Sequence, residues 1–284
     1  MLRCLVVVFL FAPCIAYGQE RAAAPILIDT DIGGAIDDAF ALGLTLSSPE
    51  VELLGVTTVG EAAEDRAWIV CRLLTHAGRT NVPVAFGRGE QPKGPIDWQI
   101  QYRRHPAVVW SRTNKPAATP AVELLYEKLK AAPREVTVVA LGPLTNVAQL
   151  FREHPDAKSL LKRLVVMGGA LEVGYNAQPP AVSEWNIKQD VAAAQAVFAA
   201  GVPTLVVPLD ATAGVKFAPE QERRLFAAGT PLAFQLANLM ELCEQPDQSL
   251  FDAVAVAAAT SDQFLTIEDR RLKVADDGRT LAGP

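Results

Sequence analysis

The sequence predicts an α/β fold: a single domain with a mostly parallel central sheet, an open sheet of the Rossmann-like type, and helices on both faces. Three observations predict it. Apolar runs rich in β-branched residues alternate with segments of helical periodicity, as in parallel β–α–β units. The apolar runs are continuous, as expected for strands covered on both faces. Finally, the 284 residues are 50% hydrophobic and 20% charged, which is enough for one sizeable core.

Six apolar runs are expected to form the sheet: residues 26–31, 51–59, 82–87, 136–141, 163–167 and 204–209, with a final strand at 271–275. Apolar residues at helical spacing predict helices at residues 38–46, 64–77, 120–131, 145–152, 191–200 and 253–260. Residues 87–119 interrupt the alternation and are too long for an ordinary connection, so we expect a functional lid or a disordered segment there.

Residues 1–18 have the pattern of a secretory signal peptide. A positive end with Arg3 precedes an apolar core at residues 5–11 and a small-x-small cleavage pattern at 16–18. The apolar core is too short to span a membrane, which requires about 20 apolar residues. We therefore expect a mature domain at residues 25–284 that is exported to the periplasm or the medium and is not bound to a membrane.

The composition narrows the possible partners. A formal net charge of −6 and a pI near 5.2 argue against a nucleic-acid partner, which would favour a basic face. Without the signal peptide two cysteines remain, Cys71 and Cys243. Cys71 lies in a helical pattern, which favours a buried free thiol, although the sequence alone leaves a disulfide between the two open.

The most informative segment follows the first expected strand. Residues 26–42 place Asp29 and Asp31 at the end of the strand and Asp37 and Asp38 at the start of a helix, at the edge where open α/β sheets bind ligands. Two like charges about 4 Å apart repel by roughly 4 kcal/mol at an effective dielectric of 20. A helix-capping role explains one aspartate but not four. The segment therefore predicts a site for a hard cation.

Later segments place polar groups at strand ends in the same way. Leu141 stands before a Gly-Pro turn, where its carbonyl would face the crevice, and Met167 is followed by two glycines that allow close backbone approach. Glu184 and Asn186 are two residues apart, on one side of an expected extended segment, which suits recognition of vicinal hydroxyls. Asp252 opens the last helix and could complete a metal site. Taken singly, the acids are equally well explained as loop or capping residues.

In this order the motifs resemble the nucleoside hydrolases, which are calcium-dependent N-ribohydrolases. The resemblance runs from residue 26 to about residue 278 and rests on Asp-Thr-Asp, Asp-Asp-Ala, Leu-Gly-Pro-Leu-Thr-Asn, Met-Gly-Gly, Glu-x-Asn and the late aspartate. It implies hydrolysis of the N-glycosidic bond of a nucleoside, a bound Ca²⁺ ion and assembly into dimers or tetramers.

The resemblance also implies a role for each matching residue. Asp31 would be the general base that activates water. The Ca²⁺ ligands would be Asp31, Asp38, the carbonyl of Leu141 and Asp252. The substrate-binding residues would be Asp37, Met167, Asn176, Glu184, Asn186 and Phe251. Asp29 would lie behind the acidic loop and orient it. Calcium takes six to eight oxygen ligands, which leaves room for water and two sugar hydroxyls.

Three positions depart from the family pattern. The acidic loop is two residues longer than its commonest form, Glu61 stands where an asparagine is expected, and Phe251 replaces the histidine with which many members protonate the leaving base. Members that prefer purines stack the base between aromatic rings. Phe251 with Trp98, Tyr102 or Trp185 could do the same, so we expect purine nucleosides to be favoured.

Two other functions remain open at this point. A haloacid-dehalogenase-like phosphatase also begins with a strand and Asp-x-Asp, but its acidic pair for magnesium comes late in the chain, whereas here a pair follows almost at once. A protein that binds nucleosides or sugars without turnover is the second alternative, because Phe251 and Glu61 remove groups that the enzymes use.

Overall fold

A computed structural model describes residues 23–89, 91–93, 99–100, 103, 114–243, 249–261 and 266–283. Within these residues a six-stranded sheet has the order β3-β2-β1-β4-β5-β6, and every neighbouring pair is parallel. The strands are β1 (Ala24–Thr30), β2 (Val51–Thr58), β3 (Val84–Phe86), β4 (Thr137–Ala140), β5 (Arg163–Met167) and β6 (Thr204–Val207). The prediction of a single α/β domain with an open parallel sheet is confirmed.

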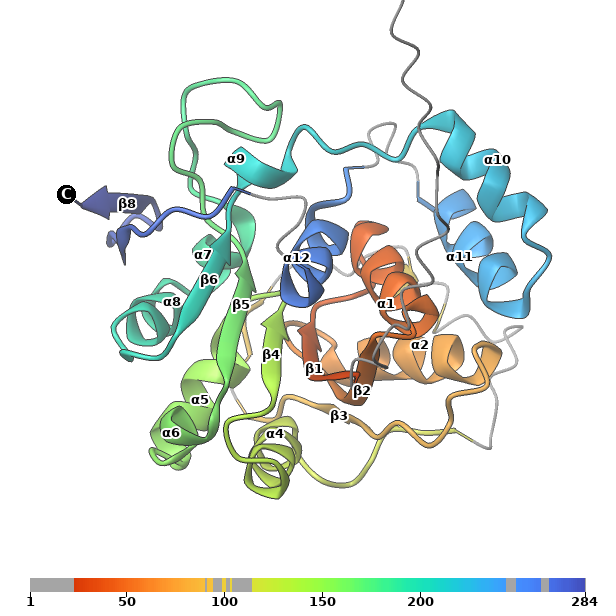
Figure 1. The fold of residues 1–284 in the computed structure, drawn as a ribbon, viewed down its shortest axis with the longest axis horizontal. Coiled ribbons are helices and arrows are strands. Elements are labelled where there is room, and N and C mark those ends of the chain that lie inside the picture. The colour runs from red at the N-terminus through yellow and green to blue at the C-terminus, as the bar shows by residue number, and fades with distance from the viewer. Residues whose placement is uncertain are drawn as a thin grey trace, which may run out of the picture.

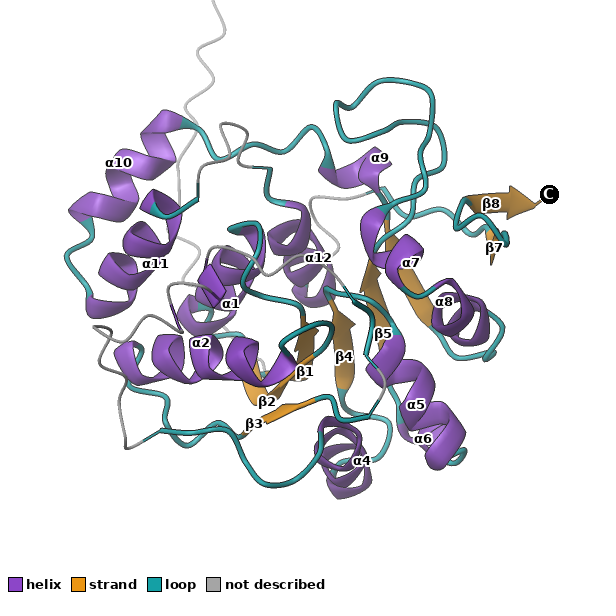
Figure 2. Cartoon of the chain, turned by 180° about the vertical axis from the view of Figure 1, so that it is seen from behind, coloured by secondary structure: helices purple, strands orange, loops and turns teal. Residues whose placement is uncertain are grey.

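Helices cover both faces of the sheet (Figures 1 and 2). One face carries α1 (Asp37–Ser47), α2 (Ala63–His76), α11 (Pro231–Glu241) and α12 (Phe251–Thr260), with α10 (Pro219–Ala227) outside α11. The other carries α4 (Ala121–Ala131), α5 (Thr145–Glu153), α6 (Ala157–Leu160) and α8 (Val191–Phe198). Two short helices, α7 (Trp185–Gln189) and α9 (Leu209–Thr212), follow the ends of β5 and β6.

The continuous apolar strands serve two separate cores. In β1, Ile26 and Ile28 belong to the core under α1, α2 and α12, whereas Leu27 belongs to the core under α4, α5 and α8. All three side chains are fully buried, because successive side chains of a strand point to opposite faces. Each such side chain stabilises the fold by about 1.5–3 kcal/mol, so the two layers hold the strand ends in place.

One prediction of local structure is confirmed with an unexpected pairing, and another is wrong. The expected last strand forms as β7 (Arg271–Val274), which pairs antiparallel with β8 (Thr280–Gly283) in a hairpin apart from the sheet. Only Val274 of β7 packs into a core, so burial does not draw the strand into the sheet. The segment with Glu184 and Asn186 is not extended, because the carboxylate of Glu184 caps α7.

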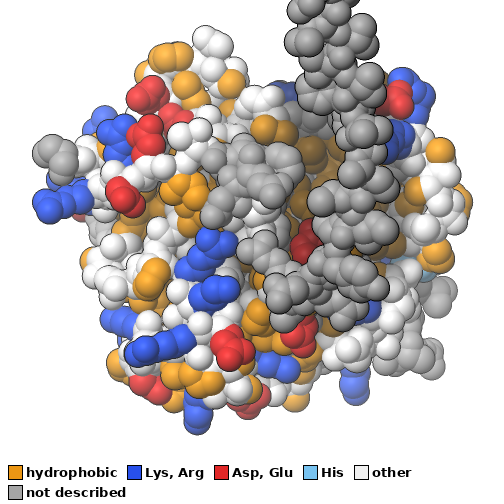
Figure 3. All heavy atoms as spheres, viewed as in Figure 1, with side chains coloured by type: hydrophobic (Ala, Val, Ile, Leu, Met, Phe, Trp, Pro, Cys, Tyr) orange, Lys and Arg blue, Asp and Glu red, His pale blue; other side chains and the backbone are white. Residues whose placement is uncertain are grey.

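Several sequence predictions lie outside the described residues: the signal peptide at 1–18, and Trp98, Tyr102 and most of the long segment at 87–119. Cys71 is a buried free thiol, as predicted, and Cys243 is buried as well. No helix in the described part of the chain is long and apolar enough to cross a membrane. On the face shown in Figure 3, the visible basic and acidic side chains are interspersed.

Candidate active site

A cavity of about 480 Å³ opens at the carboxyl ends of the strands. Here β1 and β4 lie side by side although their connections run in opposite directions along the sheet, which is the switch point where open α/β sheets bind ligands. The residues that line the cavity follow β1, β2, β3 and β4, end or follow β5, or belong to α1, α2, α7 and α12. They include, of the predicted site, Asp31, Asp37, Asp38, Leu141, Met167, Glu184, Asn186, Phe251 and Asp252.

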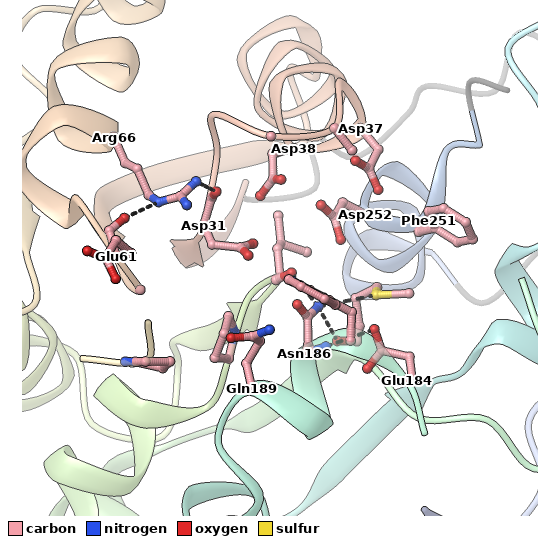
Figure 4. Close-up of a pocket in the computed structure, with 18 of the residues that line it drawn as sticks. Asp31, Asp37, Asp38, Glu61, Arg66, Glu184, Asn186, Gln189, Phe251 and Asp252 are labelled. Atoms are coloured by element: carbon pink, nitrogen blue, oxygen red, sulfur yellow. Dashed lines mark hydrogen bonds between the residues drawn. The ribbon is translucent and has the colours of Figure 1, made fainter. Parts of the chain in front are cut away.

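Three of the carboxylates form a compact group. Asp37, Asp38 and Asp252 each offer an oxygen atom within 4.8 Å of the others, and all three side chains are buried. The first two open α1 and the third lies in the first turn of the neighbouring α12, so two helix N-termini face the group (Figure 4). Thr30 at the end of β1 donates a hydrogen bond to Asp38. The oxygen ligands and their negative charge suit a hard cation.

The negative charge of these three buried carboxylates must be balanced by protons or by a cation. Burial, followed by the charge of Asp31, raises the pKa of Asp37 to about 7. Burial and the neighbouring carboxylates raise the pKa values of Asp38 and Asp252 well above their ordinary range. Carboxylates so placed either hold protons or neutralise a cation. The donor set therefore fits a metal ion, and Asp37 belongs to it as closely as the predicted ligands Asp38 and Asp252.

The remaining predicted ligands lie beside this group. Asp31 is not one of its three members, but its charge raises the pKa values of all of them, and its side chain lies opposite Asp38 in Figure 4. Gly142 allows this placement, because a Cβ there would lie 2.9 Å from Asp31 Oδ1. The Leu141 carbonyl accepts a hydrogen bond from Asn186 Nδ2 at 2.8 Å, and it has a second lone pair for another partner.

The opposite wall is built from β5 and α7. The carboxylate of Glu184 accepts hydrogen bonds from three backbone N–H groups: those of Asn186 (3.0 Å), Ile187 (3.2 Å) and Gly169 (3.1 Å). Burial nevertheless raises its pKa to about 7. The Asn186 amide also donates to the carbonyl of Met167 at 3.3 Å, so it ties the end of β5 to the turn after β4. The wall therefore presents a carboxylate and an amide in fixed positions.

Aromatic side chains line another part of the cavity. Tyr175 meets Phe251 edge to face, with ring centroids 5.9 Å apart, and the Tyr175 hydroxyl accepts a hydrogen bond from the backbone of Trp185 at 2.7 Å. Trp185 is 46% exposed, which leaves its ring open to a ligand. The predicted residue Asn176 is not brought to the cavity: it is exposed, and its Oδ1 accepts from the Gln178 backbone.

The buried residue Asp29 lies behind the acidic loop, as expected. Its Oδ1 accepts hydrogen bonds from Thr57 Oγ1 at 2.6 Å and Asn146 Nδ2 at 2.8 Å, which links β1 to β2 and α5. Burial raises its pKa to about 7. It does not line the cavity, so its contacts orient the end of β1.

Among the charged, amide and aromatic side chains that line the cavity, sequence reasoning missed three: Arg66, Tyr175 and Gln189. A signal for Arg66 was present. It shares the buried face of α2 with Ala63, Ala67 and Val70 at the spacing of a helical stripe, and a charged residue within an apolar stripe requires a polar partner. Tyr175 and Gln189 carried no such signal, because a loop residue and the end of a short helix show no periodicity.

Comparison with known proteins identifies the family. Residues 26–283 match the model of the inosine-uridine preferring nucleoside hydrolases. The pyrimidine-specific ribonucleoside hydrolase RihA of Enterobacter sp. (strain 638) is 34% identical over 281 residues, which cover 92% of this chain and 87% of that protein. The protein of the same name from Klebsiella pneumoniae subsp. pneumoniae is 33% identical over 276 residues, with the same coverage.

Solved structures agree with this match. The plant nucleoside hydrolase PpNRh1 has a TM-score of 0.79 and 28% identity, over 92% of this chain and 87% of that one. A purine-preferring ribonucleoside hydrolase from Gardnerella vaginalis also reaches 0.79 at 23% identity, over 91% and 88% of the two chains, and shows the shared fold. The phosphatase alternative loses its support. The chain belongs to the inosine-uridine preferring nucleoside hydrolase family, whose members are glycosidases that act on N-glycosidic bonds.

Proposed function

We propose that this protein hydrolyses the N-glycosidic bond of ribonucleosides to free base and ribose, and that it does so with a bound Ca²⁺ ion. The observation that carries the proposal is the convergence of Asp37, Asp38 and Asp252, all buried, beside Asp31 in one cavity at the carboxyl edge of the sheet. Oxygen ligands of this kind favour calcium over softer metals.

In this proposal each wall of the cavity has its own task. Asp31 accepts the proton of the attacking water. Asp37, Glu184 and Asn186 bind ribose hydroxyls, and Met167 packs against the sugar. The carboxylates stabilise the positive charge that develops on the sugar as the bond to the base breaks. Calcium, held by Asp38, Asp252, Asp31 and the Leu141 carbonyl with Asp37 nearby, would acidify the bound water and hold the sugar hydroxyls.

Two observations favour different bases. The aromatic side chains of Phe251, Tyr175 and Trp185 offer a surface for stacking a purine, which is the preference that we expect from the sequence. The curated relatives at 34% and 33% identity are named pyrimidine-specific, which makes a pyrimidine nucleoside the second candidate. Initial rates with inosine and uridine decide between them. Uridine as the better substrate would end the purine proposal.

The experiment that tests the function is base release from a panel of nucleosides, with and without a chelator of divalent cations. Turnover that stops on chelation and returns with Ca²⁺ supports the proposal. Metal analysis of active protein should find one calcium per chain, and zinc in its place would contradict the assignment. Tight binding of nucleosides without any base release would instead favour the binding protein without turnover.

Two further proposals concern the protein in its natural setting. We propose that residues 1–18 direct export and are then removed, so the mass of protein recovered from outside the cytoplasm should correspond to a chain that lacks them. We also propose a dimer or tetramer, as the family resemblance implies. Light scattering of purified protein tests this, and a monomer at all concentrations would refute it.

A further inference from the structure

Arg66 is a buried cation in the wall of the acidic cavity. It projects from the first turns of α2 and is only 6% exposed. Within the described residues its guanidinium donates hydrogen bonds to three backbone carbonyls: Nε to Glu61 at 2.8 Å, and Nη1 to Ile32 at 2.9 Å and to Asp31. Figure 4 shows the side chain between Glu61 and Asp31.

These carbonyls belong to two segments that are far apart in the sequence. Asp31 and Ile32 begin the acidic loop after β1, whereas Glu61 lies in the turn between β2 and α2. The acidic loop passes close to the guanidinium at Gly33. This residue has a φ of +129°, and a Cβ there would lie 3.1 Å from Arg66 Nη1. The charge of Arg66 also acts on the group formed by Asp37, Asp38 and Asp252: it lowers the pKa of Asp38, whereas burial raises it.

We propose that Arg66 is a positioning residue for hydrolysis, which holds the backbone at Asp31 so that this carboxylate faces the reacting centre. The inference rests on the proposed function, in which Asp31 is the general base. Because Arg66 grips the backbone of the residue whose carboxylate reacts, its loss moves the base without removing it. A misplacement of 1 Å can cost about 100-fold in rate.

The geometry explains why this position holds an arginine. A planar guanidinium presents several N–H groups in a fixed fork and can therefore reach carbonyls on both segments at once. A lysine places its charge at a single nitrogen, so it keeps the positive charge near Asp38 without bridging the two segments. Arg66→Met removes the charge and the donors, while Arg66→Lys separates charge from fork geometry.

Arg163 offers a matched control. It lies at the amino end of β5, whereas the cavity lies at the carboxyl ends of the strands. Its Nη2 donates to the carbonyls of Ala259 at 2.7 Å and Ala258 at 3.4 Å, at the end of α12. It is thus a second guanidinium that binds backbone carbonyls, but it does not line the cavity. Arg163→Met reports what the loss of such an anchor does to stability alone.

The test combines kinetics with amide hydrogen exchange on the calcium-loaded full chain. Arg66→Met should lower kcat about 100-fold with a much smaller change in KM and in the Ca²⁺ concentration needed for activity. Exchange should become faster at residues 31–36. Arg66→Lys should stay close to Arg66→Met, and Arg163→Met should keep both kcat and the exchange of this loop.

Several outcomes overturn the inference. Wild-type kcat in a folded Arg66→Met protein contradicts it, as does unchanged exchange at residues 31–36. Full recovery by Arg66→Lys would assign the effect to charge rather than to position. A failure of the proposed function is seen separately, because it appears in the wild type as an absence of base release, whereas the exchange measurement does not depend on turnover.

Discussion

The two walls of the cavity treat buried carboxylates in different ways. On the α1 and α12 side, Asp37, Asp38 and Asp252 crowd together, and the charges of Asp37 and Asp38 raise the pKa of Asp252. On the β5 side, Glu184 stands apart and accepts three backbone hydrogen bonds, two from the helix that it caps and one from Gly169 after β5. The carboxylates of the first wall need a cation to balance their charge, whereas backbone N–H groups already supply hydrogen bonds to the carboxylate of the second wall.

The two walls therefore differ in whether their carboxylates stabilise the protein in the absence of a ligand. A carboxylate that satisfies backbone donors stabilises the protein whether or not a ligand is present, because those donors would otherwise be buried without partners. A cluster of like charges destabilises the metal-free protein, and metal binding returns that free energy. Changes to the two walls should therefore have different, and partly opposite, effects on stability and activity.

Removal of calcium should have the largest effect. In a chelator we expect base release to stop altogether and the melting temperature to fall, because the acidic wall loses its counter-charge. Addition of Ca²⁺ should restore both. Thermal unfolding and initial rates measured on the same samples check this, and activity that persists in chelator would show that the acidic wall works without a metal.

Asp31→Asn should affect activity far more than stability. Loss of a general base costs roughly 10²–10⁴-fold in rate, and weaker metal coordination would add to that. Single-turnover base release, with circular dichroism to confirm folding, measures the effect. Near-normal turnover in a folded Asp31→Asn protein would mean that another group activates the water.

Stability should respond in opposite directions when the two walls are altered. Glu184→Ala leaves backbone donors without partners and should cost about 1–3 kcal/mol for each donor that remains unsatisfied. Asp252→Asn relieves repulsion in the acidic cluster, so the metal-free variant should be at least as stable as the wild type near neutral pH. Urea unfolding in chelator compares them. Equal losses in both variants would erase the distinction between the walls.

The pH dependence sharpens the same comparison. Asp29, Asp37 and Glu184 have pKa values of about 7 in the fold, above their ordinary values of 3.8, 3.8 and 4.5. The folded state thus binds protons more tightly than the unfolded chain. The metal-free protein should therefore lose stability as the pH rises from the ordinary pKa values of these groups towards about 7. Each group contributes up to about 1.4 kcal/mol per pH unit.

Calcium should oppose this trend at the acidic cluster, because it binds the ionised forms of Asp37, Asp38 and Asp252. Melting temperatures at about pH 5 and about pH 8, with chelator and with Ca²⁺, test the sign. Metal-free protein that is equally stable at both pH values would show that these carboxyls are already ionised in the fold at the lower one, and a gain towards the higher pH would contradict the raised pKa values.

Phe251→Ala should have the smallest effect. An aromatic contact contributes about 0.5–1.5 kcal/mol beyond its buried area, which amounts to a few-fold loss in rate. If Phe251 stacks on the leaving base, turnover of inosine should fall more than turnover of p-nitrophenyl riboside, whose leaving group needs no proton. Equal losses on both would mean that Phe251 only packs beside Asp252 at the start of α12.

The parts of this protein that depend on local pattern can be predicted from the sequence. The parallel sheet follows from continuous apolar strands that alternate with helical segments, because a strand such as β1 needs a core on each face. The acidic loop after β1 also follows, since strand ends of a parallel sheet meet at one edge. These patterns predict the fold, whereas the resemblance of the motifs to a family predicted the family and the site residues, of which all but Asn176 line the cavity.

Which side chains share the cavity depends on the tertiary packing and could not be predicted from local pattern. Asp252 joins Asp37 and Asp38 because α12 packs against α1, and Arg66 reaches the acidic loop because α2 turns a charged residue inward. Asn176, in contrast, lies outside the cavity. Strand β7 pairs with β8 in a hairpin and does not join the central sheet. Periodicity reports which face of an element is buried, but which elements meet there depends on packing between segments that are distant in the sequence.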